Sequence, residues 1–169
     1  MSGIDFESLI KAVTEGCVTK VQKYIKGGGS VFLPDLGFSL YHIAARYGHA
    51  DIIKALSVSG ADVNTPDKNG ATPVLLSAMN GHVHTIRALA ALGADVNTPA
   101  KNGVTPVYIA AHNGHVDAIK ALVALGADVN TPANDGATPV SMAAHNGDVD
   151  VIRALIAFGA DVNTPDKNG

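Results

Sequence analysis

The sequence predicts an all-α solenoid, a right-curved stack of helix-turn-helix units joined by β-hairpin-like loops. The motif Gly-Ala-Asp-Val-Asn recurs every 33 residues, beginning at Gly60, Gly93, Gly126 and Gly159. The motif Thr-Pro-Val recurs at the same interval, beginning at Thr72, Thr105 and Thr138. A period of this length indicates a repeat protein, in which stacked units bury each other's apolar faces.

The period divides a single domain into successive units. The repeats 67–99, 100–132 and 133–165 align without a gap. The repeat 34–66 has a weaker start, because Ser39-Leu40-Tyr41-His42 stands where the next unit has Thr-Pro-Val-Leu. We interpret residues 1–33 as a degenerate N-terminal capping repeat and residues 166–169 as the start of a truncated further repeat.

Each unit is predicted to begin with a tight hairpin and to continue into two short helices. Both residues of the hairpin dipeptides tolerate positive φ angles; these dipeptides are Asn69-Gly70, Asn102-Gly103 and Asp135-Gly136. Thr72 then suits the N-cap and Pro73 the first position of a helix that ends near Gly81. A second helix is expected from Val83 to Leu92, with Val83, Ile86 and Leu89 on one apolar stripe.

Helices this short are marginal alone, so neighbouring units must cover their apolar stripes. Small residues let the first helices approach closely; they are Ala44-Ala45, Ser77-Ala78, Ala110-Ala111 and Ala143-Ala144. The core between units is expected to consist of Ile53, Ile86, Ile119 and Ile152 with Leu56, Leu89, Leu122 and Leu155. At the C-terminal end, Val149, Ile152 and Leu155 are expected to lack cover. The chain is then either cut from a longer array or self-associates through this uncapped face.

Composition excludes several function classes. A net charge of −3 in 169 residues, with a pI near 6.1, argues against a dedicated binder of nucleic acid or of an anionic membrane. No apolar run approaches the ~18 residues of a membrane span, and no basic-then-apolar secretory signal opens the chain. Cys17 is the only cysteine, which precludes an internal disulfide. We therefore expect a soluble, cytoplasmic or otherwise intracellular protein.

The sequence predicts no catalytic residue, no metal and no cofactor. His112 and His145 lie one unit apart, on helices that pack about 8–10 Å from each other. That separation is too large for two ligands at ~2.0–2.1 Å from one zinc ion. Cys17 has no His or Asn motif beside it, and the acidic residues form no acid/base pair. The run Gly27-Gly28-Gly29 lacks the Lys and helix of a phosphate loop.

These motifs together resemble the ankyrin-repeat family. The third full unit shows them most completely, with Gly-x-Thr-Pro from Gly103, Ala-Ala-x-x-Gly-His from Ala110 and Gly-Ala-Asp-Val-Asn from Gly126. The resemblance implies a structural hydrogen-bonding role for His49, His82 and His115. The chain departs from the family pattern where the Thr-Pro-Leu-His motif keeps its His only at His42, and where Asp148 and Cys17 replace the His that follows Gly.

The resemblance implies that hairpin tips and first helices line a concave groove that binds a partner protein, which the sequence does not identify. The positions that differ most between units fall there: Phe38, His42, Arg46, Tyr47, Lys68, Asn69, Leu75, Met79, Asn80, Lys101, Asn102, Val104, Tyr108, His112, Asn113, Asn134, Asp135, Ser141, His145 and Asn146. Aromatic and Arg side chains are typical anchors, so Arg46, Tyr47, Met79 and Tyr108 are favoured. The alternative is drift on a solvated face.

The same turns resemble substrates of the cytosolic asparaginyl hydroxylase, which implies hydroxylation at Asn64, Asn97, Asn130 and Asn163. The alternative is that these Asn side chains only bond the turn backbone. We interpret the chain as a non-enzymatic protein–protein interaction module or scaffold that binds a protein, with no nucleic acid and no membrane. Two alternatives stay open: a targeting or regulatory segment of a larger enzyme, and a secreted bacterial effector acting in the host cytosol.

Overall fold

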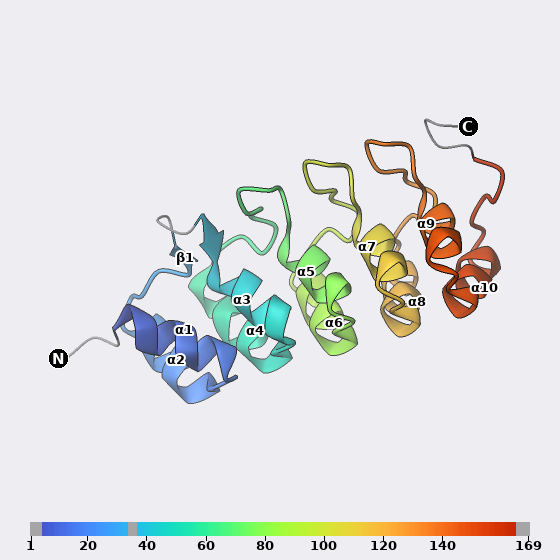
Figure 1. Ribbon diagram of the computed structural model, residues 1–169. Helices are drawn as coiled ribbons and strands as arrows, with labels where there is room; N and C mark the ends of the chain where they lie inside the picture. Colours follow the sequence, from blue (N-terminus) through green and yellow to red (C-terminus); the bar gives the residue numbers. More distant parts are fainter. Residues whose placement is uncertain (1–4, 34–36, 165–169) are drawn as a thin grey trace.

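The computed structural model describes residues 5–33 and 37–164, and it confirms the predicted all-helical repeat solenoid. Paired helices follow one another along an elongated stack, and the loops between pairs project from one side of it (Figure 1). The helices are α1 (Phe6–Thr14), α2 (Val18–Lys26), α3 (Leu40–Tyr47), α4 (Ala50–Leu56), α5 (Pro73–Met79), α6 (Val83–Ala91), α7 (Pro106–His112), α8 (Val116–Ala124), α9 (Pro139–Asn146) and α10 (Val149–Ala157). A 3-10 turn, η1 (Ser57–Ser59), follows α4, and β1 (Phe32–Leu33) pairs antiparallel with β2 (Phe38–Ser39).

The first helix of each unit begins where the Thr-Pro motif predicts. The Thr72 hydroxyl accepts a hydrogen bond from the Leu75 N–H at 3.3 Å, and Pro73 takes the first helical position. Equivalent caps start α7 and α9, at 3.2 Å in each. Since a proline lacks the N–H that the first turn leaves unbonded, it begins a helix without loss.

The predicted positive φ angles at Asn69, Asn102 and Asp135 are wrong. Among the described residues only glycines have positive φ. The Gly70 N–H donates to the Asp67 carbonyl at 2.9 Å, and the Asp67 N–H donates to the Ala71 carbonyl at 2.9 Å. This is a type I turn closed by a glycine. The Asp67 carboxylate selects it by accepting from the Asn69 and Ala71 N–H groups at 2.7 and 2.9 Å.

Successive hairpin tips are joined to each other. The Lys101 N–H donates to the Asn69 carbonyl at 3.0 Å, and the Asn134 N–H donates to the Asn102 carbonyl at 2.9 Å. A Cβ atom at Gly103 would lie 2.6 Å from the Asn134 nitrogen, so this contact requires glycine. The tips therefore form one connected edge along the stack.

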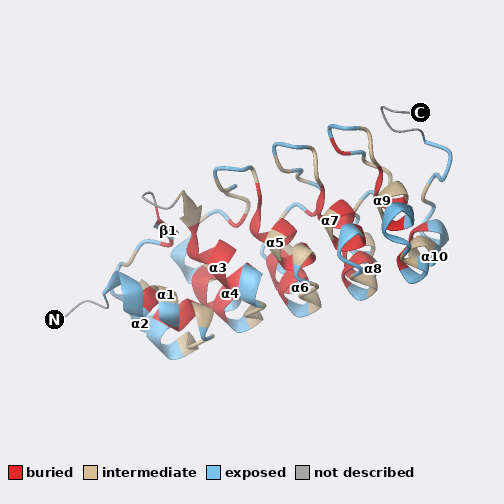
Figure 2. Cartoon of the chain, in the orientation of Figure 1, coloured by how far each residue is buried: buried red, intermediate tan, exposed pale blue. Residues whose placement is uncertain are grey.

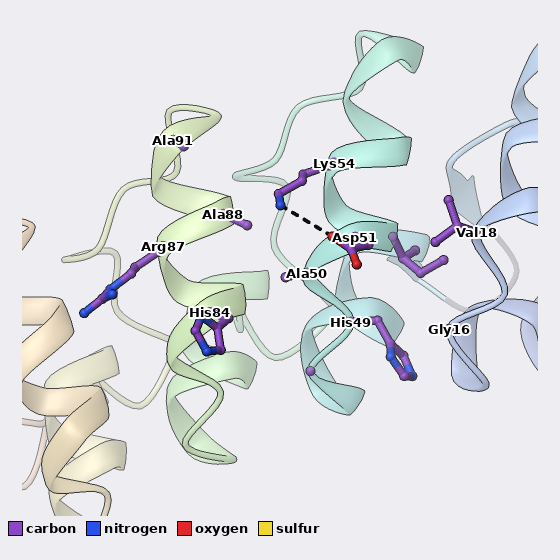
Figure 3. Close-up of a pocket in the computed structure, with 12 residues that line it drawn as sticks. Gly16, Val18, His49, Ala50, Asp51, Lys54, His84, Arg87, Ala88 and Ala91 are labelled. Carbon is purple, nitrogen blue, oxygen red and sulfur yellow. Dashed lines mark hydrogen bonds and ion pairs between the residues drawn. The ribbon is translucent and has the colours of Figure 1, made fainter.

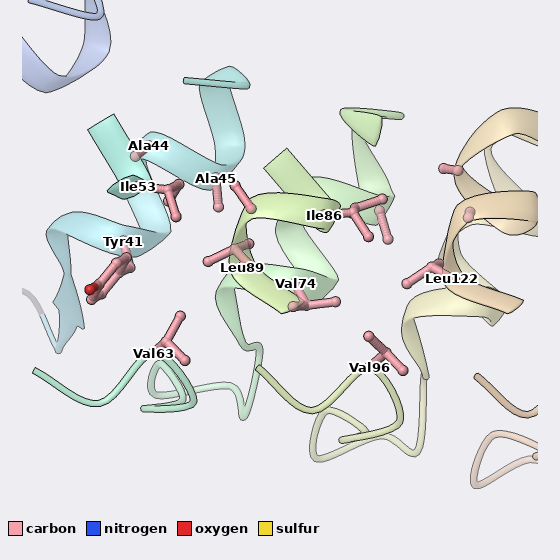
Figure 4. Close-up of a cluster of buried hydrophobic side chains, with 14 of the residues drawn as sticks. Tyr41, Ala44, Ala45, Ile53, Val63, Val74, Ile86, Leu89, Val96 and Leu122 are labelled. Atoms are coloured by element: carbon pink, nitrogen blue, oxygen red, sulfur yellow. The ribbon is translucent and has the colours of Figure 1, made fainter. Parts of the chain in front are cut away.

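The core runs through the stack without a break. Small side chains of the first helices and the Ile and Leu side chains of the second helices fill the space between units (Figure 4). The predicted Ile and Leu positions are buried, except that Ile152 is only half-buried. Ala45, Ala78 and Ala111 are fully buried by the following unit, whereas Ala144 is exposed.

Burial falls off at α10, where only Val151 and Leu155 are buried (Figure 2). The expectation that Leu155 would lack cover is wrong, because this side chain faces the preceding unit and is fully buried. Val149 is 55% exposed, Ile156 50% and Phe158 39%. The predicted start of a further unit at 166–169 lies outside the described residues. No helix in the described part of the chain is both long and apolar enough to cross a membrane.

Candidate functional site

The repeated His side chains hold neighbouring units together. The Nε2 atom of His49 donates to the Thr14 carbonyl at 2.7 Å, and those of His82 and His115 donate to the Arg46 and Met79 carbonyls at 3.1 Å. Each ring lies against a glycine of the preceding unit: a Cβ atom at Gly48 would lie 2.7 Å from the His82 Nδ1 atom. These three residues are structural, as the family resemblance implied.

The last unit replaces this contact. Asp148 stands in the His position and caps α10, accepting from the Val151 N–H at 3.1 Å. The Asn146 amide instead donates to the His112 carbonyl at 2.8 Å, and Asn113 donates to the Met79 carbonyl at 2.7 Å. Both Asn residues were predicted to contact a partner. Each amide already donates one hydrogen bond between units, and contact of these residues with a partner stays a prediction.

Four predicted groove residues are more deeply buried than the others, although His42, Leu75 and Tyr108 each line one of the cavities described below. His42 is 3% exposed, Leu75 2% and Tyr108 5%, while Ser141 is half-buried. These side chains occupy the third position of each first helix, where they close the first turn. The His42 Nδ1 atom accepts from the Ser39 N–H at 3.0 Å, and its Nε2 atom donates to the Ala71 carbonyl at 3.1 Å. Partner contact at this position stays a prediction, and the burial of these side chains leaves little of their surface for it.

The residue after each of these positions also lines the groove. Ile43, the most covered of the four, and the half-buried Leu76, Ile109 and Met142 line successive cavities on the side of the first helices. The sequence analysis missed them. Helix periodicity could have found them, because the exposed Arg46 and Tyr47 lie three and four residues after Ile43 and share its face.

Three cavities follow one another along this face, where the family resemblance implied a concave groove. The first, of about 270 Å³, lies between Ile43 and Leu76 and includes Phe38, Arg46 and Tyr47. The second, of about 620 Å³, lies between Leu76 and Ile109 and brings Arg46 of α3 together with Lys101 of a hairpin tip. The third, of about 410 Å³, lies between Ile109 and Met142. A row of apolar floors with polar rims is the arrangement expected of a binding groove.

Most other predicted groove residues lie at the rims. Phe38, Met79 and Val104 are half-buried, whereas the exposed ones are Arg46, Tyr47, Lys68, Asn69, Asn80, Lys101, Asn102, Asn113, His112, Asn134, Asp135, His145 and Asn146. The pKa of Tyr108 is raised, chiefly by burial and further by the negative charge of Asp135. A neutral Tyr108 thus lines the third cavity.

A further cavity of about 640 Å³ lies on the opposite side, among the second helices α2, α4 and α6 (Figure 3). Its Lys54 ammonium pairs with the Asp51 carboxylate at 3.4 Å, and the His49 Nε2 atom is bonded to Thr14. Arg87 extends away from Asp51 (Figure 3). Of its charged or titratable side chains, His49 bonds the preceding unit, and Lys54 and Asp51 pair within α4.

Within residues 5–33 and 37–164, no group of three or more His, Cys, Asp or Glu side chains could hold a metal ion. Cys17 caps the start of α2, where the Lys20 N–H and the Thr19 hydroxyl lower the pKa of its thiol. This thiol lies in the turn where the other units have His or Asp.

The repeated Asn side chains bridge one turn to the next. The Asn64 amide donates to the Gly93 carbonyl at 3.1 Å, and its oxygen accepts from the Asp95 N–H at 2.8 Å. Asn97 and Asn130 make the same pair of bonds to the following turn. Asn163 makes no such bridge within the described residues. Bonding to turn backbone, the alternative to hydroxylation, thus occurs at the first three sites.

Comparisons with known proteins agree with this geometry. A family profile described as ankyrin repeats (3 copies) matches residues 9–100 and 41–133, and one described as ankyrin repeats (many copies) matches residues 111–156. The chain is 39% identical over 77 residues to a 2-5A-dependent ribonuclease of Mus musculus and 38% identical over 77 residues to that of Homo sapiens. It is 35% identical over 66 residues to an ankyrin repeat-containing protein of Schizosaccharomyces pombe.

These alignments are partial. Each ribonuclease alignment covers 44% of this chain and 10% of the relative, and the yeast alignment covers 38% of this chain and 32% of the relative. The chain therefore spans a minor part of each relative that it matches.

Proposed function

The chain belongs to the ankyrin-repeat family, and on that premise we propose that it is a non-enzymatic module that binds a partner protein in its concave groove. Ankyrin repeats are generally protein-interaction modules. The observation that carries the proposal is the row of three cavities between the first helices and the hairpin tips. Their rims carry exposed Arg46, Tyr47 and Lys101, whose side chains form no hydrogen bond or ion pair within residues 5–33 and 37–164.

Preorganisation supplies the mechanism. The hairpin tips are bonded to each other, and His and Asn side chains fix each first helix to the next. A surface held in this way loses little conformational entropy when a partner docks. Binding energy then comes from apolar contacts on the floor and from polar contacts at the rim.

Affinity capture with matched variants tests this proposal. Arg46→Glu with His112→Glu places two negative charges on the concave rim, and Arg87→Glu with His84→Glu places the same charges on the second-helix side. Mass spectrometry of captured proteins should show partners lost by the first double variant and kept by the second. Partners lost only by the second variant would refute the concave site.

A regulatory or targeting role within a larger protein is a second candidate. The chain aligns with only a small part of each relative, and two of these relatives are named as ribonucleases, which favours this candidate. The chain then supplies the binding segment, and another region supplies the activity. A complete reading frame that encodes repeats alone would remove this candidate.

We also propose that the end face of α10 pairs with a second copy of the chain. Val149, Ile156 and Phe158 place exposed apolar surface there. Hydroxylation of Asn64, Asn97, Asn130 and Asn163 remains a proposal that rests on the family resemblance. Both are tested below.

A further inference from the structure

We propose that the groove receives an extended, polyproline-II-like segment of the partner, with an apolar side chain at every third residue. An acidic side chain of that segment lies in the second cavity, between Arg46 and Lys101. This inference rests on the proposed function and specifies the class of partner that the groove recognises.

The first argument is the spacing of the apolar residues that line the floor of the groove. Leu76, Ile109 and Met142 are equivalent residues of successive first helices, and each lies between two neighbouring cavities or at the edge of one. These helices pack through fully buried Ala and Ser side chains. Axes of packed helices are about 8–10 Å apart, so the cavities repeat at about that distance.

A polyproline-II segment matches both this distance and this direction. It rises about 3.1 Å per residue with three residues per turn, so every third side chain advances about 9 Å and points the same way. In a β-strand, residues three apart point to opposite faces, so only every second or fourth side chain could enter a cavity, at about 7 or 13 Å. The side-chain spacing of a β-strand therefore does not match the repeat distance of the cavities.

The rim distinguishes an extended segment from a helix. The Arg46 guanidinium, the Lys101 ammonium and the Asn102 amide nitrogen are donors that bond no acceptor among the described residues. An extended segment carries unbonded backbone carbonyls that such donors can bind, because polyproline II has no internal hydrogen bonds. The carbonyls of a helix are already bonded within the helix.

Two positively charged side chains in the second cavity indicate where the acidic side chain of the partner binds. Arg46 and Lys101 lie 55 positions apart in the sequence but line the same cavity. Asp67 also lines this cavity, but its Oδ1 atom is held by the N–H groups of Asn69 and Ala71. Three ion pairs are formed in the described part of the chain, and they involve other lysines. The two cations are thus available to a partner carboxylate.

Fluorescence anisotropy with labelled synthetic peptides tests the inference. The probes are sets of about twelve-residue peptides with the same number of Leu residues and a central Glu, and with Pro and Ser at the other positions. In the first set Leu occurs at every third position, in the second at alternate positions, and in the third at the spacing of an amphipathic helix, with Ala in place of Pro. We expect the first set to bind at least tenfold more tightly than the other two.

Matched variants of the whole chain locate the bound peptide. Arg46→Ala should weaken binding of the first set about two- to fivefold and reduce its dependence on salt, whereas Arg87→Ala should leave it unchanged. Leu76→Ala should weaken binding about tenfold, whereas Leu92→Ala, on the second-helix side, should not. Thermal melts verify folding, and Val104→Ala replaces Leu76→Ala if that variant unfolds.

The outcomes separate this inference from the proposed function. Tighter binding of the second or third set, or equal binding of all three, overturns the extended segment with period three. The concave site still stands in that case if Arg46→Glu with His112→Glu abolishes capture of partners. Failure of all peptides overturns the inference as well, and a simultaneous loss of partners only with Arg87→Glu and His84→Glu refutes both.

Discussion

The bridge between successive turns gives the sharpest test of how the units are joined. In Asn97→Ala, two hydrogen bonds to the following turn are lost: the amide bond to the Gly126 carbonyl at 3.1 Å and the bond from the Asp128 N–H at 2.8 Å. A hydrogen bond contributes about 0.5–1.5 kcal/mol to stability, so the variant should lose about 1–3 kcal/mol. The chain itself supplies the control, because Asn163 has the same local sequence but makes no such bridge within the described residues.

Urea unfolding and thermal melts, both followed by circular dichroism, measure the stability of the two variants. Asn97→Ala should lower the free energy of unfolding by the amount above and the melting temperature by about 2–4 °C for each kcal/mol. Asn163→Ala should change the free energy by no more than about 0.5 kcal/mol, as expected of a surface substitution. Equal losses in the two variants would show that Asn acts within its own turn, and the reasoning about bridges would be refuted.

Four further predictions follow from burial and exposure. Tyr108→Ala should cost about 3 kcal/mol of stability because the ring is buried, and a melt equal to that of the unchanged chain would contradict this. Burial lowers the pKa of His42 below 6.5 in the folded chain, so the unfolded state binds more protons and stability is lost as the pH falls below about 6.5. Urea unfolding at pH 7.5 and 5.5 should show a smaller loss in His42→Gln, and an equal loss would assign the effect to other groups. Sedimentation velocity should show that the chain self-associates. The double variant Phe158→Ser with Ile156→Ser should abolish this association, whereas the control Val58→Ser, at an exposed site elsewhere, should retain it. A monomer at all concentrations would dismiss the end-face pairing. Co-expression with the asparaginyl hydroxylase should add one oxygen atom to Asn163 sooner than to Asn64, Asn97 and Asn130, whose amides bridge two turns. An unchanged intact mass would dismiss the modification.

The helical caps and the stacking of units could be predicted because they depend on local sequence. Thr72 and Pro73 start a helix through their own side chains, and the small side chains of Ser77 and Ala78 allow close approach wherever the helices meet. The hairpin geometry could not be read from Asn69-Gly70 alone. The Asp67 carboxylate, two residues earlier, bonds the turn and selects a type I geometry.

The groove on the first helices and hairpin tips stays a prediction, and the structure adds how deeply each predicted position is buried. His42, Leu75 and Tyr108 vary between units and were therefore assigned to the surface. Variation in identity does not reveal depth, and each of these side chains is buried. The floor residues Leu76 and Ile109 are ordinary aliphatic residues in the sequence, and only their helical spacing from exposed positions separates them from core residues.

By itself the sequence determined the repeat, the elements of each unit and the interfaces between units. These depend on residues that recur at a fixed interval, so every copy reports the same local physics. Only the tertiary structure decided which side chains face the groove and which groups of different units meet there. Arg46 and Lys101 share a cavity because stacking brings a helix end of one unit beside a hairpin tip two units later. That juxtaposition depends on the rise and curvature of the stack, which are properties of the packed helices rather than of any one repeat.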